Sequence, residues 1–231
     1  LEAQRIAAAH EVRIVGIHCH IGSGWLSVEE PLLALDVMFA FAKDFPDLSF
    51  LDAGGGFGIP YRPGDRTLDL PLLGKKTAEK YKAFTELYGR EVSLRFEPGR
   101  FLVAEAGVLV AEVSETKILG SGRPYVGLNT SMAHLLRPAF YGSYHEVQNI
   151  SRGGEMQSTD IGGNVCECAD FFAKDRMFPK SQVGDIVIIK NAGAYGFSMS
   201  SEYQFRPRPA EVMVDGGEIK LIRKRETVGD L

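Results

Sequence analysis

The first hundred residues of the chain repeat one order of segments: a short apolar strand, a glycine-rich or polar loop, and a helix. The strand-like segments are VRIVGIHCH, LSFLDA and VSLRFEPGR, each a short run rich in apolar and β-branched residues. Two helix-like segments, PLLALDVMFAFAKDF and TAEKYKAFTELYG, alternate with them. This alternation predicts parallel βα units, whose chemistry gathers at the loops after the carboxyl ends of the strands.

The ends of the two predicted helices carry local signals. Ser27 and Glu30 have the spacing of a capping box at the start of the first helix. Gly89 follows the second helix, at the place where glycine commonly closes a helix. We therefore expect a helix after each of the first two strands.

The pattern changes near residue 102, where strands and turns replace helices. The clearest case is a hairpin near the end of the chain, in which AEVMV and EIKLI flank an Asp-Gly-Gly turn. We expect a βα domain at 1–101 and a mostly β domain at 102–231. Three βα units cannot close an eight-stranded barrel, so either the sheet is open or further units lie upstream of Leu1.

Composition argues against two classes of protein. The net charge of −4 does not suit a nucleic-acid binder, which usually carries a basic excess. The longest apolar run, LLALDVMFAFA, contains Asp36 and is shorter than the roughly 20 residues of a membrane span. The 3 cysteines fit a reducing compartment better than a disulfide scaffold, so we expect a cytoplasmic protein.

Three loops that follow the predicted strands should meet at one rim. DAGGGFG (52–58) has three consecutive glycines, which let backbone N–H groups approach an anion such as phosphate. GSG (22–24) is similar, and the hydroxyl of Ser23 could bind the same phosphate. EPGR (97–100) adds a carboxylate and a guanidinium, for which a salt bridge is by itself the simpler explanation.

The HCH triplet in GIHCHIGSG allows several kinds of site. His18 and His20 share a strand face, as two zinc ligands would, but no third ligand has a useful spacing and the other histidines are scattered. Cys19 points to the opposite face, which weakens a cysteine–histidine nucleophile. Two interpretations stay open: packed, hydrogen-bonded histidines, or a flat ring that stacks on a flat cofactor.

Six motifs occur in the order found in the diaminopimelate decarboxylases, a group within the fold type III pyridoxal-phosphate enzymes. The motifs are GIHCHIGSG, DAGGGFGIPY, EPGRFLVAEAG, RPAFYGSYH, CE-x-x-D and GAYGFSMSSEY. The resemblance runs from about residue 12 to the end of the chain. It implies the C-terminal part of a pyridoxal-phosphate-binding (β/α)8 barrel, followed by a C-terminal β-barrel-like or β-sandwich domain.

The resemblance also implies roles for individual residues. Cys166, His20 and Glu97 resemble catalytic residues: the thiol that handles protons at Cα, the histidine that stacks on the pyridine ring, and the acid that pairs with the ring nitrogen. The implied cofactor-binding set is His20, Ser23, Gly54, Gly55, Gly56, Glu97, Gly99, Arg100 and Tyr195. The implied substrate-binding set is Arg100, Arg137, Tyr141, Glu167 and Tyr195. No metal is implied, and Cys166 and Glu167 would come from the partner subunit of a homodimer.

The chemistry of those residue types suits the implied reaction, decarboxylation of meso-2,6-diaminopimelate to L-lysine and CO2. Loss of CO2 leaves a carbanion, for which a protonated pyridine ring is an electron sink. A carboxylate such as Glu97 keeps that ring protonated. The substrate has a second amino-acid end. Arginines can bind the carboxylate of that end, and Glu167 can bind its ammonium group. A thiol at Cys166 can return the proton to Cα.

The chain departs from the family pattern at a few places. The family attaches its cofactor through a lysine in a YA-x-KA-like context, which is absent here, so we expect that lysine upstream of Leu1 and no activity from this segment alone. The usual P-x-C-E-S is NVCEC here, with Asn164 and Cys168. The usual NYN after SMSS is EYQ, with Glu202 and Gln204.

These departures leave alternatives. A sister decarboxylase would act on D-ornithine, D-lysine or carboxynorspermidine. An inactive relative would bind a partner without catalysis. A zinc hydrolase is the most distant alternative.

Overall fold

The chain divides into two compact units, Leu1–Leu102 and Val103–Leu231. The computed structural model describes residues 2–231. Each unit has a hydrophobic core of its own. Within the described residues, no helix combines the length and apolar character that crossing a membrane would require.

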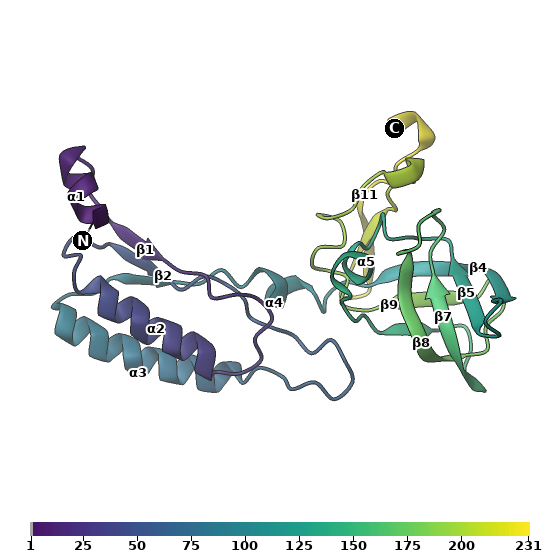
Figure 1. The fold of residues 1–231 in the computed structure, drawn as a ribbon, viewed down its shortest axis with the longest axis horizontal. Coiled ribbons are helices and arrows are strands. Elements are labelled where there is room, and N and C mark those ends of the chain that lie inside the picture. Colours follow the sequence, from purple (N-terminus) through teal and green to yellow (C-terminus); the bar gives the residue numbers. More distant parts are fainter. Residues whose placement is uncertain (1) are drawn as a thin grey trace. The chain divides into compact units, whose positions relative to one another are not determined.

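The first unit is built from three parallel strands with two helices packed beside them (Figure 1). The strands are β1 (Gly16–His18), β2 (Phe50–Asp52) and β3 (Ser93–Arg95), in the spatial order β1-β2-β3. The helices are α1 (Glu2–Ala9), α2 (Glu29–Ala42), α3 (Leu70–Tyr88) and the short α4 (Gly99–Val103). Both strand pairs are parallel, as the alternation of strands and helices predicts.

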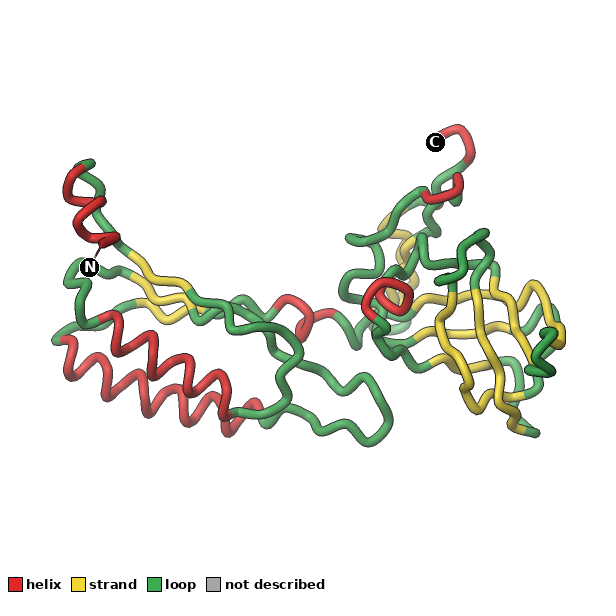
Figure 2. The backbone as a smooth tube through the Cα atoms, viewed as in Figure 1, coloured by secondary structure: helices red, strands yellow, loops and turns green. Residues whose placement is uncertain are grey.

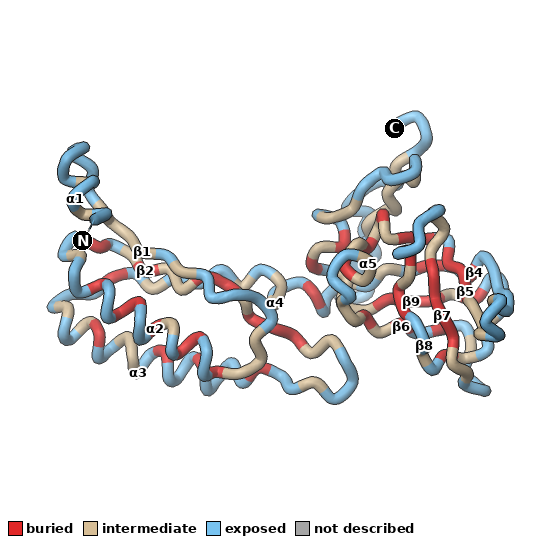
Figure 3. The backbone as a smooth tube through the Cα atoms, in the orientation of Figure 1, coloured by how far each residue is buried: buried red, intermediate tan, exposed pale blue. Residues whose placement is uncertain are grey.

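The core of the first unit lies between the sheet and the helices α2 and α3. Leu51, in the central strand, is fully buried. Phe39 of α2 stacks on Phe84 of α3 with ring centroids 4.6 Å apart, and Phe84 stacks in turn on Tyr88 at 5.1 Å. Figure 3 shows this pattern as buried stretches that recur along the two helices. The apolar faces seen in the sequence therefore hold the helices on the sheet.

The helix ends agree only in part with the sequence signals. The predicted glycine end of α3 is confirmed: Gly89 has a left-handed φ of 84° and donates its N–H to the carbonyl of Thr85 at 2.9 Å. The predicted capping box on α2 is wrong. Val28 occupies the N-cap position without a side-chain hydrogen bond, because the Ser27 hydroxyl donates to the Glu30 carboxylate instead of accepting from the backbone.

The second unit contains a six-stranded sheet that curls toward closure. Its strands are β4 (Leu109–Ile118), β5 (Pro124–Leu128), β6 (Val147–Asn149), β7 (Met156–Gly162), β8 (Phe171–Pro179) and β9 (Ile186–Ile189). Their order is β6-β9-β4-β5-β7-β8, all pairs being antiparallel except β5 with β7. The two outer strands, β6 and β8, contact one another, so the sheet is barrel-like, in agreement with the expected β domain (Figure 2).

Short elements complete the second unit. They are α5 (Arg137–Tyr141), the 3₁₀ turns η1 (Tyr203–Phe205) and η2 (Val228–Asp230), and the hairpin strands β10 (Glu211–Asp215) and β11 (Glu218–Arg223). The predicted hairpin is confirmed: β10 and β11 pair antiparallel around Gly216 and Gly217, both with positive φ. The glycines are needed there because a two-residue turn of this kind requires the left-handed region at both positions.

Candidate active site

The loops after β1, β2 and β3 meet at the carboxyl edge of the sheet, as the sequence predicts. His18 and Asp52 end their strands in register with one another. Glu97 follows β3, and its carboxylate lies 3.1 Å from Nε2 of His18. One ligand-type atom from each of these three residues lies within 4.8 Å of the others. The edge of the sheet thus gathers an imidazole and two carboxylates that are far apart in the chain.

His20 presents an oriented ring at the same edge. The backbone N–H of Gly55 donates to Nδ1 of His20 at 3.2 Å, so that nitrogen is an acceptor and the ring is held from one side. The residue is exposed, which leaves the ring accessible. Cys19 instead packs against the core, as the alternation of strand side chains predicts, and burial raises the pKa of its thiol, with the charge of Asp52 adding to this.

The glycines at 54–56 are required by close contacts between loops. A Cβ on Gly54 would lie 2.4 Å from the carbonyl oxygen of Cys19, and one on Gly55 would lie 2.2 Å from that of Glu97. A Cβ on Gly56 would lie 2.1 Å from the carbonyl oxygen of Gly22. Any side chain larger than hydrogen would push the three loops apart, so the glycine run sets the geometry of the whole edge.

Ser23 and Arg100 form the cationic side of the site. Nη2 of Arg100, in the short helix α4, donates to Oγ of Ser23 at 2.9 Å. The guanidinium also lies over the ring of Tyr61, 5.7 Å from its centroid. Glu97 and Arg100 of the EPGR loop therefore contact different neighbours, the carboxylate meeting an imidazole and the guanidinium a hydroxyl.

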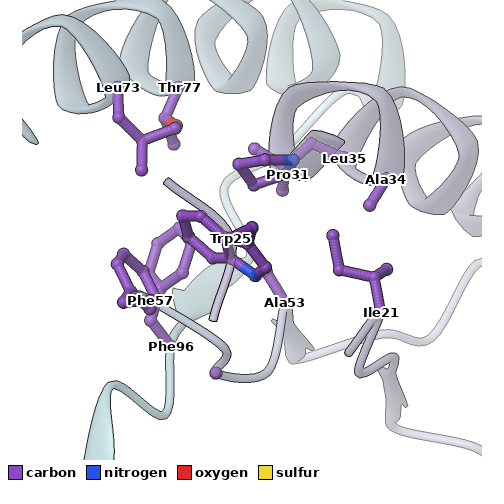
Figure 4. A pocket seen from close by; sticks show the side chains of 11 residues that line it. Ile21, Trp25, Pro31, Ala34, Leu35, Ala53, Phe57, Leu73, Thr77 and Phe96 are labelled. Atoms are coloured by element: carbon purple, nitrogen blue, oxygen red, sulfur yellow. The ribbon is translucent and has the colours of Figure 1, made fainter. Parts of the chain in front are cut away.

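A small apolar pocket lies beneath the glycine loop, between it and the two helices (Figure 4). Trp25, Leu35, Phe57 and Leu73 are among the residues that line it. Trp25 packs on Phe57 with ring centroids 4.6 Å apart, and the two residues form a parallel bridge. This packing supports the glycine loop from the core side.

Three of the predicted substrate-binding residues gather in the second unit. Arg137 is buried, and its Nη2 donates to Oγ of Ser143 at 3.2 Å. Its guanidinium lies 5.8 Å from the ring centroid of Tyr141 and 5.2 Å from that of Tyr195. Tyr195 has a φ of 64°, a strained conformation for a tyrosine. A buried cation framed by two phenol rings suits a carboxylate ligand.

Cys166 and Glu167 lie on a separate loop, between β7 and β8, and both are exposed. The Glu167 N–H donates to the Val165 carbonyl at 2.9 Å, which turns the chain tightly at Cys166. Asp170 is buried and accepts from the N–H of Val165 at 3.0 Å. The thiol and the carboxylate are therefore displayed by a loop whose backbone is fixed.

Comparison with known proteins identifies the family. The family described as "Pyridoxal-dependent decarboxylase, C-terminal sheet domain" matches residues 32–193. The chain belongs to the pyridoxal-dependent decarboxylases. This agrees with the resemblance in the six motifs and with the barrel-like sheet of the second unit.

The decarboxylases similar to this chain are longer than it. A diaminopimelate decarboxylase of Methanothermobacter thermautotrophicus is 41% identical over 100% of this chain and 55% of its own length. The crystal structure of diaminopimelate decarboxylase from Helicobacter pylori complexed with L-lysine has a TM-score of 0.88 and 32% identity, over 99% of this chain and 57% of that one. The lysine/ornithine decarboxylase from Vibrio vulnificus complexed with cadaverine has a TM-score of 0.75 and 26% identity, over 88% and 55%. The chain thus spans about half the length of the relatives it matches.

The sheet edge fits the pyridoxal phosphate of this decarboxylase family. The glycine run leaves no room for side chains where the loops meet, and a hydroxyl and a guanidinium lie together at Ser23 and Arg100. This combination is suited to a phosphate. The imidazole of His20 is suited to stacking on an aromatic ring, and the carboxylate of Glu97 is suited to pairing with a ring nitrogen.

Sequence reasoning missed several contacts of the candidate site. It sought a third partner for the histidines along the chain, whereas His18 meets Asp52 and Glu97 across neighbouring strands. The position of Asp52 at the end of a predicted strand was the available signal. It also missed Ser143 as the partner of Arg137, for which spacing along the chain gives no signal.

Proposed function

We propose that the full-length protein decarboxylates meso-2,6-diaminopimelate to L-lysine and CO2 with pyridoxal phosphate as cofactor. The observation that carries this proposal is the meeting of three loops at one sheet edge. There the imidazole of His20, the carboxylate of Glu97 and the Ser23–Arg100 pair converge on the glycine run. The similarity to diaminopimelate decarboxylases over the whole chain supports the substrate.

In this proposal the first unit holds the cofactor. Ser23, the glycines at 54–56, Gly99 and Arg100 would bind its phosphate, and His20 would bind its ring. Glu97 would accept a hydrogen bond from the ring nitrogen and so keep that nitrogen protonated. When bound, the cofactor supplies a sink for the electron pair that departing CO2 leaves behind.

The second unit holds the substrate and returns the proton. Arg137, between Tyr141 and Tyr195, binds the carboxylate of the end that does not react. Cys166 and Glu167 act across the interface of a homodimer, where Glu167 binds the distal ammonium and the thiol of Cys166 gives a proton to Cα. The exposure of both residues on a fixed loop supports this assignment.

A substrate comparison tests the reaction. We expect release of CO2 and L-lysine from meso-diaminopimelate by the full-length protein, measured by coupled CO2 detection and by amino-acid chromatography. D-ornithine, D-lysine and carboxynorspermidine are the competitors. Higher kcat/KM with one of these would replace the proposed substrate, and no turnover together with no absorbance change on adding pyridoxal phosphate would favour an inactive binding protein.

Mixing inactive variants tests the shared site. We expect Cys166→Ala and Arg137→Ala homodimers each to lose most of their activity. Subunit exchange between equal amounts of them should restore about a quarter of the wild-type activity, because about half of all dimers are then mixed and each mixed dimer carries one intact site out of two. No recovery after verified exchange would show that one subunit supplies both residues.

A cytoplasmic location is proposed with this function, which the three free cysteines support.

A further inference from the structure

The loop that displays Cys166 is held by a second segment, η1 and the residue after it. Nη2 of Arg206 donates to the carbonyl oxygen of Asn164 at 2.6 Å. The hydroxyl of Tyr203 donates to Oε2 of Glu167 at 3.4 Å. Asn164 meets Arg206 while Glu167 meets Tyr203, so the 164–167 loop lies beside residues 203–206 with its contacts in the reverse order along the chain.

Gln204 makes the central contact of this pairing. Its Oε1 accepts from the backbone N–H of Cys166 at 2.9 Å, and its Nε2 donates to the carbonyl of the same residue at 3.1 Å. The side-chain amide therefore binds Cys166 as a neighbouring β-strand would, through both backbone groups at once. Rotation of the peptide groups on either side of the thiol breaks at least one of these bonds.

The backbone of this segment is strained where the contact is made. Gln204 has φ 55° and ψ 37°, and Phe205 has a φ of 54°. Two consecutive non-glycine residues in the left-handed region are unfavourable and persist only where surrounding contacts hold them. The conformation aims the Gln204 amide at Cys166, so the strain is maintained at the position that makes the contact.

We propose that Gln204 is a positioning residue that fixes the orientation of the Cys166 thiol through the two backbone hydrogen bonds. This rests on the proposed function, in which Cys166 returns a proton to Cα. Proton transfer requires the donor within hydrogen-bond reach of its target, and a misplacement of about 1 Å costs about a hundredfold in rate. Gln204 itself touches the backbone of Cys166 rather than its reacting atom.

Gln204→Gly separates positioning from folding. Glycine accepts the left-handed conformation without strain, so we expect an unchanged or slightly higher Tm in the full-length, cofactor-loaded protein. We expect kcat for diaminopimelate to fall about tenfold to a hundredfold with a much smaller change in KM, because Arg137 and its neighbours still bind the substrate and Tyr203 still contacts Glu167. Gln148→Ala, an exposed glutamine on β6, is the matched control and should change neither parameter.

Two readouts follow the thiol without using activity. Hydrogen exchange of the peptide that contains Cys166 should speed up in Gln204→Gly, since the Cys166 N–H loses its acceptor. Alkylation of Cys166, measured by peptide mass spectrometry, should also become faster, whereas alkylation of Cys19 should stay the same. The Gln148→Ala control should match the wild type in both measurements.

A conservative variant tests whether the amide itself is needed. Gln204→Asn keeps both the donor and the acceptor on a side chain one methylene shorter, so it should recover part of the kcat and of the exchange protection. Gln204→Glu keeps only the acceptor and should recover less. If the two variants are equal to Gln204→Gly in every readout, the hydrogen bonds do not position the thiol.

The outcomes for the two proposals are distinct. If the wild type is active on diaminopimelate but Gln204→Gly leaves kcat, exchange and alkylation unchanged, positioning by Gln204 is refuted and the function stands. If the wild type has no such activity while exchange and alkylation respond as expected, the contact stands, but its role in this reaction is refuted together with the proposed function.

Discussion

At the scale of single residues, the candidate site depends on the lack of a Cβ atom at Gly54, Gly55 and Gly56. The carbonyl oxygens of Cys19, Gly22 and Glu97 occupy the places where Cβ atoms of the glycine run would lie. Each loop therefore contacts backbone rather than a flexible side chain, and none can yield without moving its neighbour. The glycines matter here for their small size as much as for their conformation.

Gly55→Ala tests this point, because Gly55 has an ordinary φ and only the steric effect remains. The new Cβ would overlap the carbonyl of Glu97. We expect a loss of about 1–3 kcal/mol in the free energy of unfolding and weaker binding of pyridoxal phosphate. Denaturant titration and a cofactor absorbance titration measure the two effects.

The control is Gly74→Ala on the exposed face of α3, where a Cβ meets nothing within 4 Å. This variant should raise stability by about 0.5–1 kcal/mol without changing cofactor affinity. Unchanged cofactor affinity in Gly55→Ala would show that the loop spacing does not matter for the cofactor.

His134 makes the stability of the second unit depend on pH. Its Nδ1 lies 2.9 Å from the hydroxyl of Thr130. Burial lowers the pKa of His134 and, together with the charges of Arg206 and Arg208, outweighs the backbone groups of Pro207 and Arg206, which raise it. Below a pH of about 6.5 the unfolded chain takes up a proton that the folded chain does not, so stability falls as the pH is lowered.

We therefore expect the free energy of unfolding to decrease between pH 7 and pH 5, and His134→Asn to reduce that slope. Denaturant titrations followed by far-ultraviolet circular dichroism at several pH values measure it. The same slope in the variant and the wild type would mean that His134 remains free to take up its proton in the folded state.

At the scale of elements, α3 shows how one helix can carry a polar group into an apolar pocket. Thr77 is buried on the face that also holds Leu73 and Phe84. Its hydroxyl makes no hydrogen bond within residues 2–231 and lies at the pocket of Figure 4. A buried hydroxyl without a partner costs stability.

Thr77→Val should therefore raise the free energy of unfolding by about 1 kcal/mol, because valine has the same shape without the hydroxyl. Thr85→Val, on the same helix, is the matched control, since it removes a hydrogen bond from Oγ1 to the carbonyl of Lys82 at 2.9 Å. Thermal unfolding compares the two. A loss of stability in Thr77→Val would show that its hydroxyl is satisfied.

The elements also show which part of the fold the sequence could predict. Apolar period and glycine placement predicted two helices, three parallel strands and the terminal hairpin. The start of α3 at Leu70 was missed, although Asp69 caps it by accepting from the N–H of Leu72 at 2.9 Å. The capping box failed because a hydroxyl can bond either to a backbone N–H or to a nearby carboxylate, and spacing alone does not decide between them.

At the scale of the whole molecule, two separate cores predict two responses to mutation. Leu51 is fully buried in the first core and Leu128 in the second. Each change to alanine should cost about 2–5 kcal/mol in its own unit. Trp25 is the single tryptophan and belongs to the first unit, so its fluorescence reports on that unit alone.

We expect Leu51→Ala to shift the midpoint of the Trp25 fluorescence transition, and Leu128→Ala to leave it unchanged while lowering hydrogen-exchange protection in β4, β5 and β7. Equal shifts of both signals in both variants would show that the two units unfold as one.

The candidate site was predictable only in part, for a reason that belongs to this same scale. Strand order can place loops at one rim, but it cannot show which side chains meet across neighbouring strands. His18 and Glu97, far apart in the chain, illustrate this. The roles of Cys166 and Arg137 came from the resemblance, because a lone cysteine or arginine carries no such signal. Gln204 was noticed only as a departure from the family pattern.

The interlocked loops at the sheet edge have a thermodynamic consequence. Because backbone contacts already fix the His20 ring and the EPGR turn, little conformational freedom is left for a ligand to remove. The rate at which a ligand binds at this edge should therefore be limited by desolvation and by diffusion rather than by slow ordering of the loops. A single fast binding phase in stopped-flow mixing, without a later isomerisation, is the kinetic signature of such a preorganised surface.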